Sequence, residues 1–255
     1  MKTVIANKRQ LIRICAGLVA MSAPAVISRS ALAAEDGQNA GGKLGDIVTA
    51  AGKEVNPPED LMREHGVLDR VLLIYEAALA KYSSNSDFDP AVVTQAAQVI
   101  RDFINDYHEK SEEEQIFPRF KAKGMMTDLV DTLLTQHQAG RRVTETILQY
   151  APNSRLYADD RRQVIVSMQA FIRMYRPHAA REDTELFPKL RNIVSAHEFD
   201  SIAEDFEKKE RQLFGEDGFG KMVQRVASIE TSIGIYQLAQ FTPSTGTETT
   251  GTGNH

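Results

Sequence analysis

The chain has 255 residues, of which 42% are hydrophobic, and carries 30 Lys and Arg against 35 Asp and Glu, a formal net charge of −5 at pH 7. This acidic balance disfavours nucleic acid and anionic lipid as partners, because both reward positive charge. No apolar run reaches the ~20 residues that a helix needs to span a bilayer. Because both ends have a non-globular composition, we expect one main domain between them.

Residues 1–33 are typical of a cleavable secretory signal. A basic start precedes an apolar stretch from Ile14 to Ile27, and Ala31-Leu32-Ala33 then offers the small residues that a signal peptidase reads, with cleavage before Ala34. A membrane anchor is the alternative, but the stretch is short and the Ala-x-Ala end favours cleavage. Lys8-Arg9 is a near match to a twin-arginine signal, which leaves Sec and Tat export open. We therefore expect a periplasmic or secreted protein without membrane attachment after cleavage.

Cleavage changes the chemistry available to the mature chain. It removes five basic residues and no acidic ones, which moves the net charge to about −10. It also removes Cys15, the only cysteine of the chain. The mature protein then has neither a disulfide nor a thiolate ligand, so any metal ion must be bound by imidazole and carboxylate groups.

Two segments of the mature chain lack the composition of a folded core. Residues 34–56 are rich in Gly, Ala and charge and are interpreted as a linker. Residues 242–255 are mostly Thr, Gly and Ser and are predicted to be a disordered tail.

Between these segments, apolar residues recur at three and four positions, the period of an amphipathic helix. Four long helices are predicted from just after Pro57-Pro58 to about Lys81, from Asp89-Pro90 to near Phe117-Pro118, from about Thr127-Asp128 to near Tyr150, and from about Ala158 to Phe187. We expect Pro177 to kink the last of them, because proline removes a helical hydrogen bond.

A C-terminal extension over residues 191–241 contains two more predicted helices, from Ser195 to Leu213 and from Lys221 to about Gln237, joined by the glycine-rich segment 215–220. No stretch alternates with the period of a strand. The sequence therefore predicts an all-α protein: an up-and-down four-helix bundle over residues 57–190, with the extension packed outside it or across one end.

Four of the six histidines lie on the predicted apolar faces, one on each bundle helix: His65, His108, His137 and His178. A single histidine on an apolar face is more often a core residue than a metal ligand. One on each of four helices that share a core favours a metal site.

Carboxylates extend two of these faces. Glu112 follows His108 and Glu182 follows His178 by four residues, so each pair shares one side of its helix. A buried carboxylate needs a partner or a metal ion. The two segments also repeat at an offset of 70 residues, each reading HxxxE and then an apolar residue, Phe and Pro. Two such hairpins about a pseudo-twofold axis would bring four imidazoles and two carboxylates together.

These residues resemble the hemerythrin-like, or HHE cation-binding, family over about residues 57–190. The stretches 57–65 and 234–241 are similar to an exported subgroup of that family. The resemblance implies a four-helix bundle around a non-haem di-iron centre whose ions are bridged by two carboxylates. It further implies the terminal ligands His65, His108, His137 and His178, with Glu112 as one bridge.

The chain departs from the oxygen-carrying members at two positions. Arg141 stands where they have a second histidine, and a guanidinium stays protonated and does not ligate metal. The centre would then have an open position or bind a single ion. For the second bridge, the internal repeat favours Glu182, whereas the spacing in the oxygen carriers points to Asp183. Glu64, Glu109 and Glu113 flank the ligands and are either acceptors for the imidazoles or solvated acids.

The donor set permits iron, manganese or zinc, and the resemblance favours iron, two ions per chain. We expect a binding protein for O2, NO or iron itself, because the missing fifth histidine argues against reversible oxygen transport alone. The alternatives are an iron-dependent oxidase or peroxidase-like enzyme, for which no substrate pocket or catalytic residue is recognisable, and a structural bundle with a degenerate or zinc site.

Overall fold

The computed structural model describes residues 55–84 and 86–243. The predicted signal, nearly all of the predicted linker and most of the predicted tail lie outside these residues. No helix in the described part of the chain combines the length and the apolarity that crossing a membrane requires.

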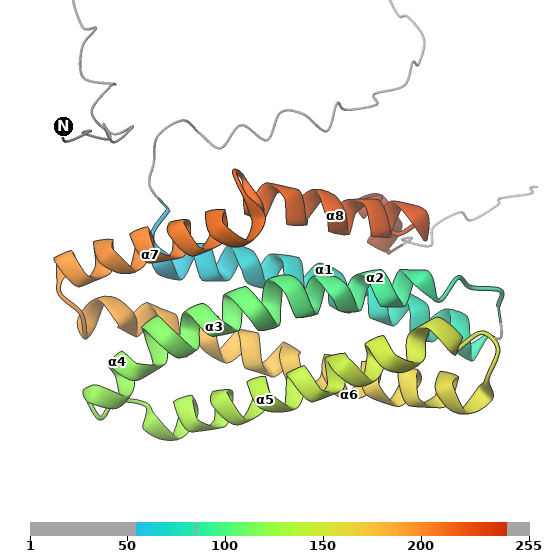
Figure 1. Cartoon of the computed structure of the whole chain (residues 1–255), viewed down its shortest axis with the longest axis horizontal. Coiled ribbons are helices and arrows are strands. Elements are labelled where there is room, and N and C mark those ends of the chain that lie inside the picture. Colours follow the sequence, from blue (N-terminus) through green and yellow to red (C-terminus); the bar gives the residue numbers. More distant parts are fainter. Residues whose placement is uncertain (1–54, 85, 244–255) are drawn as a thin grey trace, which may run out of the picture. The chain divides into compact units, whose positions relative to one another are not determined.

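Four long helical stretches form an up-and-down bundle, as the sequence predicts (Figure 1). The first is α1 (Pro57–Ser83), and the second is composed of α2 (Ala91–Val99), η2 (Ile100–His108), α3 (Glu109–Ser111), η3 (Glu112–Ile116) and α4 (Phe117–Ala122). The third is α5 (Thr127–Tyr150) with the short η4 (Ala151–Asn153), and the fourth is α6 (Ala158–Arg181) with η5 (Glu182–Leu186) and η6 (Phe187–Asn192). The prediction of an all-α bundle is confirmed.

Local chemistry explains where α1 begins. The side chain of Asn56 accepts a hydrogen bond from the amide of Glu59 at 3.2 Å and thereby caps the helix. Pro57 is the first helical residue, where its missing N–H has no helical partner to lose.

The predicted ends of the second and fourth helices were too early. The second continues past Pro118 to Ala122, and the fourth continues past Phe187 as a 3-10 turn to Asn192. Helical structure also continues through Pro177 to Arg181. Pro118 and Pro188 are tolerated because each stands in the first turn of a new segment, where no helical hydrogen bond requires its N–H.

Those segments begin anew because π-helical turns precede them. The amide of Phe117 donates to the carbonyl of Glu112, and the amide of Phe187 to that of Glu182, each spanning five residues. A longer π-helical segment, η2, ends at His108. Such turns insert an extra residue into a helix and are frequent at functional sites. They rotate the following residues relative to a regular α-helix, which the periodicity of the sequence does not reveal.

The C-terminal extension forms α7 (Ala196–Phe214), α8 (Gly218–Ser232) and the short η7 (Leu238–Phe241). Helix α8 begins at Gly218, earlier than predicted, and also ends earlier, at Ser232. Its early end is explained by Gly234, whose positive φ of 75° just beyond the helix is typical of a helix C-terminus. Both α7 and α8 pack along α1 and the second helical stretch (Figure 1). Met222, Val226 and Ile229 of α8 enter the main core, which confirms that the extension covers the outside of the bundle.

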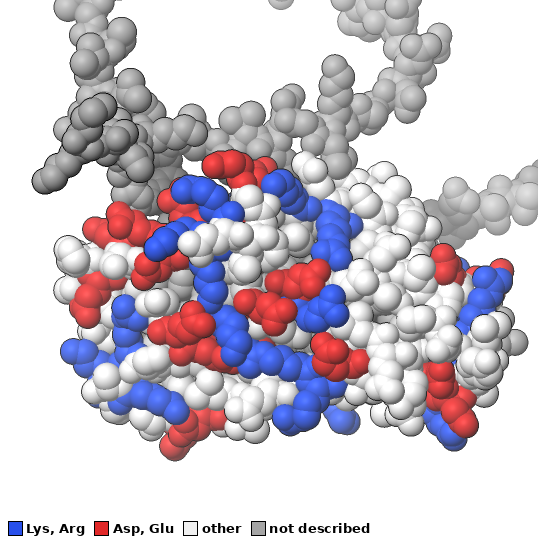
Figure 2. Space-filling model, in the orientation of Figure 1, with Lys and Arg blue, Asp and Glu red and all other residues white. Residues whose placement is uncertain are grey.

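The apolar interior consists of two clusters along the bundle. The larger includes Val71, Phe103 and Phe171, and the smaller includes Leu61 and Phe120. On every bundle helix a histidine lies between a residue of one cluster and a residue of the other. A polar layer is therefore enclosed between two apolar ones. Outside, Lys and Arg are interspersed with Asp and Glu over much of the face shown in Figure 2.

Candidate metal centre

Four imidazoles meet in the polar layer, one from each helical stretch. His65 and His137 come from α1 and α5, and His108 and His178 from η2 and α6; all are at most 3% exposed. The Nε2 atoms of His65 and His108 are 3.0 Å apart, and those of His137 and His178 are 3.2 Å apart. The structure thus arranges the four predicted histidines as two pairs, and each pair comes from one helical hairpin.

Two fully buried carboxylates connect the pairs. Glu112 directs Oε1 to Nε2 of His108 at 3.6 Å and Oε2 to Nε2 of His137 at 3.4 Å. Glu182 directs Oε2 to Nε2 of His178 at 3.1 Å and to Nε2 of His65 at 3.4 Å. Each carboxylate therefore faces one imidazole from each hairpin, which is the placement of a bridge between two ions.

The outer nitrogen of every imidazole meets an oxygen acceptor. Nδ1 of His65 contacts Asp183 at 2.7 Å, that of His108 contacts Glu64 at 2.7 Å, that of His137 contacts Glu113 at 3.1 Å, and that of His178 contacts Gln136 at 2.9 Å. Carboxylate and amide oxygens accept hydrogen bonds, so these contacts suit the metal-ligating form of each imidazole, which carries its hydrogen on Nδ1. In that form the lone pair of each Nε2 points into the centre, as in protein sites where an acceptor orients a ligating imidazole.

The acceptors follow the same internal repeat as the histidines. Glu64 and Gln136 each precede the first histidine of a hairpin and bind the second histidine of that hairpin. Glu113 and Asp183 each follow a bridging-position glutamate and bind the first histidine of the other hairpin. Asp183 therefore lies on the outer side of His65, and its side chain is 32% exposed. The sequence did not predict a role for Gln136. An alignment of the two hairpins would have indicated one, because Gln136 precedes His137 as Glu64 precedes His65.

The repeated Phe-Pro motif closes the centre on one side. Phe117 stacks on His137 with ring centroids 5.4 Å apart, and Phe187 stacks on His65 at 5.7 Å. Both rings are about 1% exposed, so they keep water from the imidazoles. The motif places apolar surface immediately after each π-helical turn.

The residues fit a bound cation. Among the described residues, the four carboxylate oxygens of Glu112 and Glu182 are buried without any hydrogen-bond partner, a costly arrangement unless a positive charge satisfies them. A metal ion binds imidazole nitrogen at ~2.1 Å, so two nitrogens in neighbouring positions on one ion lie roughly 3 Å apart. The separations within both histidine pairs match this value. Two groups of two imidazoles and one carboxylate have ligand atoms within 4.8 Å of one another.

Burial and charge shift the titratable groups in different directions. Burial lowers the pKa of His137 to about 4. Burial raises the pKa of Glu112, and the nearby charge of Glu182 raises it further. For Glu182 burial opposes ionisation, but the imidazoles of His178 and His65 outweigh it and lower the pKa. A bound cation favours the ionised form of both carboxylates.

Arg141 lies on the outer side of His137. Its Nη2 atom is 2.9 Å from Oε2 of Glu109 and 2.8 Å from Oε1 of Glu113. Glu109 is nearly completely buried and also accepts a hydrogen bond from the hydroxyl of Tyr175. The guanidinium thus pairs with the flanking carboxylates rather than entering the group of inward-facing nitrogens.

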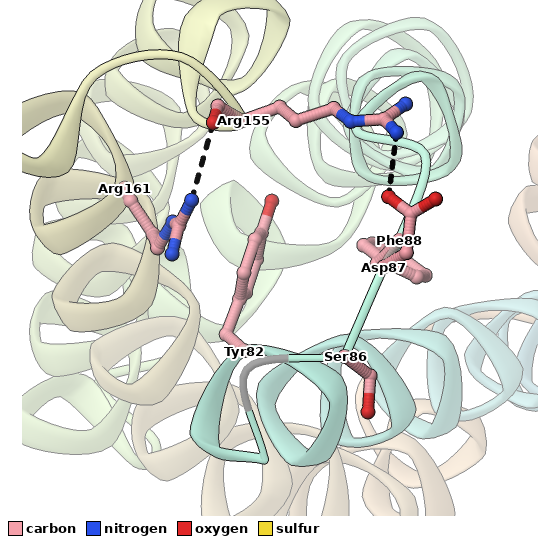
Figure 3. A pocket seen from close by; sticks show the side chains of 6 residues that line it. All are labelled: Tyr82, Ser86, Asp87, Phe88, Arg155 and Arg161. Carbon is pink, nitrogen blue, oxygen red and sulfur yellow. Dashed lines mark hydrogen bonds and ion pairs between the residues drawn. The ribbon is translucent and has the colours of Figure 1, made fainter.

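A cavity of about 240 Å³ lies far from this centre (Figure 3). It is lined by Tyr82, Ser86, Asp87, Phe88, Arg155 and Arg161. Seventeen residues of α1 separate His65 from Tyr82, a distance of about 25 Å along the helix axis. Arg155 is paired with Asp87 at 2.6 Å, and Nε of Arg161 donates to a backbone carbonyl at 3.0 Å. The cavity does not communicate with the metal-ligating groups.

Comparison with known proteins matches a family over nearly the same residues as the predicted bundle. The family model for the hemerythrin HHE cation binding domain matches residues 56–190. Three similar proteins, one from Mycobacterium bovis and one from each of two strains of Mycobacterium tuberculosis, carry the description "uncharacterized protein". Each is 42% identical over 239 residues, which cover 93% of this chain and 91% of the relative. No solved structure matches this chain.

Proposed function

Because the chain belongs to the hemerythrin HHE cation-binding family, we propose that its bundle binds two iron ions and, through them, a small ligand such as O2 or NO. Binding or sensing of that ligand, or of iron itself, is the proposed function. The observation that carries the proposal is the convergence of four inward Nε2 atoms on two buried carboxylates without hydrogen-bond partners.

The geometry supports one ion in each hairpin. His65 and His108 would bind the first ion, and His137 and His178 the second. Glu112 offers one oxygen to each pair and would bridge the ions. Glu182 contacts one imidazole of each pair and would form the second bridge.

Asp183 would act from outside this set. Its Oδ1 atom lies 2.7 Å from the outer nitrogen of His65, where it accepts the Nδ1 hydrogen and orients the ring. Of the two candidates for the second bridge, we therefore propose Glu182 as the ligand and Asp183 as the acceptor that positions His65.

The surroundings would hold the ligands in one arrangement. Glu64, Glu113 and Gln136 fix three imidazole rings through their outer nitrogens. Phe117 and Phe187 exclude water from two of the rings. Bound iron would supply redox chemistry and coordination positions for a small ligand. Two imidazoles per ion, with no fifth histidine, leave positions that the protein does not fill.

Iron content per chain, measured with a visible absorption spectrum on the anaerobically reconstituted protein, tests the proposal. We expect about two irons per chain and a spectrum that changes reversibly when O2 or NO is added. One ion per chain would refute the di-iron arrangement. Preferential binding of zinc, or no metal at all, would refute the proposed function and favour a structural bundle.

We also propose that the protein is exported before it functions. The support is the sequence of residues 1–33, with its basic start, apolar stretch and Ala-x-Ala end. Cell fractionation followed by N-terminal sequencing should find a chain that begins at Ala34 outside the cytoplasm. A chain that retains residues 1–33 in the cytoplasm would refute export.

A further inference from the structure

A cage of oxygen atoms surrounds one nitrogen of Arg141. Its Nη2 atom lies 2.8 Å from Oε1 of Glu113, 2.9 Å from Oε2 of Glu109 and 3.3 Å from the carbonyl oxygen of Asn105. Two carboxylates and a carbonyl around a positive charge form the donor set that hard cations prefer. Here a tethered guanidinium nitrogen occupies the position of the cation.

We propose that Glu109 and Glu113, together with the carbonyl oxygen of Asn105, form an outer cation site on the uptake route to the bundle centre, and that Arg141 occupies this site until a divalent ion displaces it. The existence of the outer site is independent of the proposed function. Its place on an uptake route rests on that function, because the route leads to the inner centre.

Ligand geometry supports the outer site. One oxygen from each glutamate lies within 4.8 Å of the other, and the carbonyl oxygen of Asn105 lies 3.3 Å from the Arg141 nitrogen that both glutamates contact. The carboxylate of Glu109 is 1% exposed, and its Oε2 atom has no hydrogen-bond partner. A buried carboxylate oxygen in this state requires a positive charge nearby. In the described structure only the ion pair with Arg141 supplies one.

The contacts of Arg141 suit a displaceable group. Within the described residues, its ion pairs and its hydrogen bond run through the single nitrogen Nη2, and its Nε atom is buried without a hydrogen-bond partner. A guanidinium has five N–H donors and binds most strongly when two of them engage one carboxylate in parallel. Arg141 does not form such a pair with either glutamate. A divalent ion, with twice the charge, would compete with it for both oxygens.

Exposure falls steadily from solvent toward the centre. The side chains of Arg141, Glu113 and Glu109 are 26%, 15% and 1% exposed, respectively. The ring of His137 then separates the outer site from the inner one, because Nδ1 contacts Glu113 at 3.1 Å and Nε2 contacts Glu112 at 3.4 Å. An ion at the outer site is therefore one imidazole away from the bridging carboxylate.

Cobalt(II) binding to the full chain, stripped of metal, tests the proposal through stoichiometry. We expect Arg141→Ala to bind one more equivalent of cobalt per chain than the unsubstituted protein. The added substitution Glu113→Gln should abolish that extra equivalent. Arg176→Ala is the matched control, because Arg176 pairs with Glu76 at 2.7 Å on the exposed surface. It should bind the same amount of cobalt as the unsubstituted protein.

The rate of cobalt uptake, followed by stopped-flow absorption, tests the route. Removal of the guanidinium should accelerate uptake about fivefold, the rate equivalent of ~1 kcal/mol for a partly exposed ion pair. Arg141→Gln is measured alongside, because it retains hydrogen-bond donors without the charge, and circular dichroism confirms that both variants are folded. Unchanged stoichiometry and unchanged rate in both variants would overturn the proposal.

The inner and outer sites are separated by disabling the inner one. In a Glu112→Gln, Glu182→Gln background, Arg141→Ala should still bind its single cobalt ion. If the unsubstituted protein bound no metal while Arg141→Ala bound one ion, the proposed function would fail and the outer site would stand. If the unsubstituted protein bound two ions and Arg141→Ala also bound two at an unchanged rate, the outer site would fail and the proposed function would stand.

Discussion

Replacing Gly140 with alanine would place a methyl group where the side chain of Tyr175 now lies. A Cβ atom at position 140 would be 1.9 Å from the hydroxyl oxygen of Tyr175 and 2.7 Å from its Cζ atom. The phenol is buried, stacked on Phe171 with ring centroids 4.2 Å apart, and donates a hydrogen bond to Glu109.

The cost follows from two effects. Forcing a side chain out of a packed core costs about 1–3 kcal/mol. Losing the Tyr175 hydrogen bond to the buried carboxylate of Glu109, which then keeps only Asn105 as a hydrogen-bond donor to Oε1, costs about 1.5–3 kcal/mol more. The higher helix propensity of alanine returns about 1 kcal/mol. We expect Gly140→Ala to lower the free energy of unfolding by about 3 kcal/mol. Urea unfolding of the metal-free protein at pH 7 measures it.

Gly66 provides the matched control, because it is also in a helix and has no atom within 4 Å of the Cβ position. Gly66→Ala should stabilise the protein by about 1 kcal/mol. In a Tyr175→Ala background the clash is absent, so Gly140→Ala should not lower the free energy of unfolding there. Equal destabilisation by Gly140→Ala with and without Tyr175 would refute the reasoning.

Three further predictions concern the centre. His108→Ala and His178→Ala should each strongly lower bound metal, measured by elemental analysis, whereas the exposed His197→Ala should not; equal retention in all three would contradict the ligand assignment. Asp183→Ala should weaken iron affinity by about 10-fold without abolishing binding, the effect of losing an acceptor behind a ligating imidazole, and loss of binding in a competition titration would make Asp183 a ligand. Burial raises the pKa of Glu64 to about 8, so the folded metal-free protein retains a proton that the unfolded chain releases near pH 4.5. Stability should therefore fall by about 1.4 kcal/mol per pH unit between about pH 5 and 8 and level off above pH 8, and urea unfolding of Glu64→Gln should show a smaller slope.

The boundaries that the sequence predicted well are those with local causes. The capping residues Asn56 and Ser195 bind amides three residues further along their own helices, so their effect does not depend on the rest of the fold. The ends near Pro118 and Phe187 were misplaced because proline stops a regular α-helix but not a segment that follows a π-helical turn. Nothing in the apolar periodicity distinguishes the two cases.

The orientation of neighbouring acidic residues required the tertiary structure. Glu182 and Asp183 are adjacent in the chain, and both are carboxylates within reach of His65. Only the π-helical turn that begins at Glu182, and the position of α1 against it, direct the first inward and the second to the outer nitrogen of the ring. The role of Gln136 also required the tertiary structure. In the sequence it is one polar helix residue among many, and only the packing of α6 against α5 brings His178 into contact with it.

The sequence by itself determined the helices, the single histidine on the apolar face of each, and the repeat that relates the two hairpins. These are local properties, because the spacing of residues within each helix determines which of them share its apolar face. The tertiary structure decided which nitrogen of each imidazole faces inward, which carboxylates lie between the pairs, and that Arg141 meets Glu109 and Glu113. Those contacts join residues 24 to 118 positions apart. They depend on how helices pack and where π-helical turns shift their faces, which a local pattern does not encode.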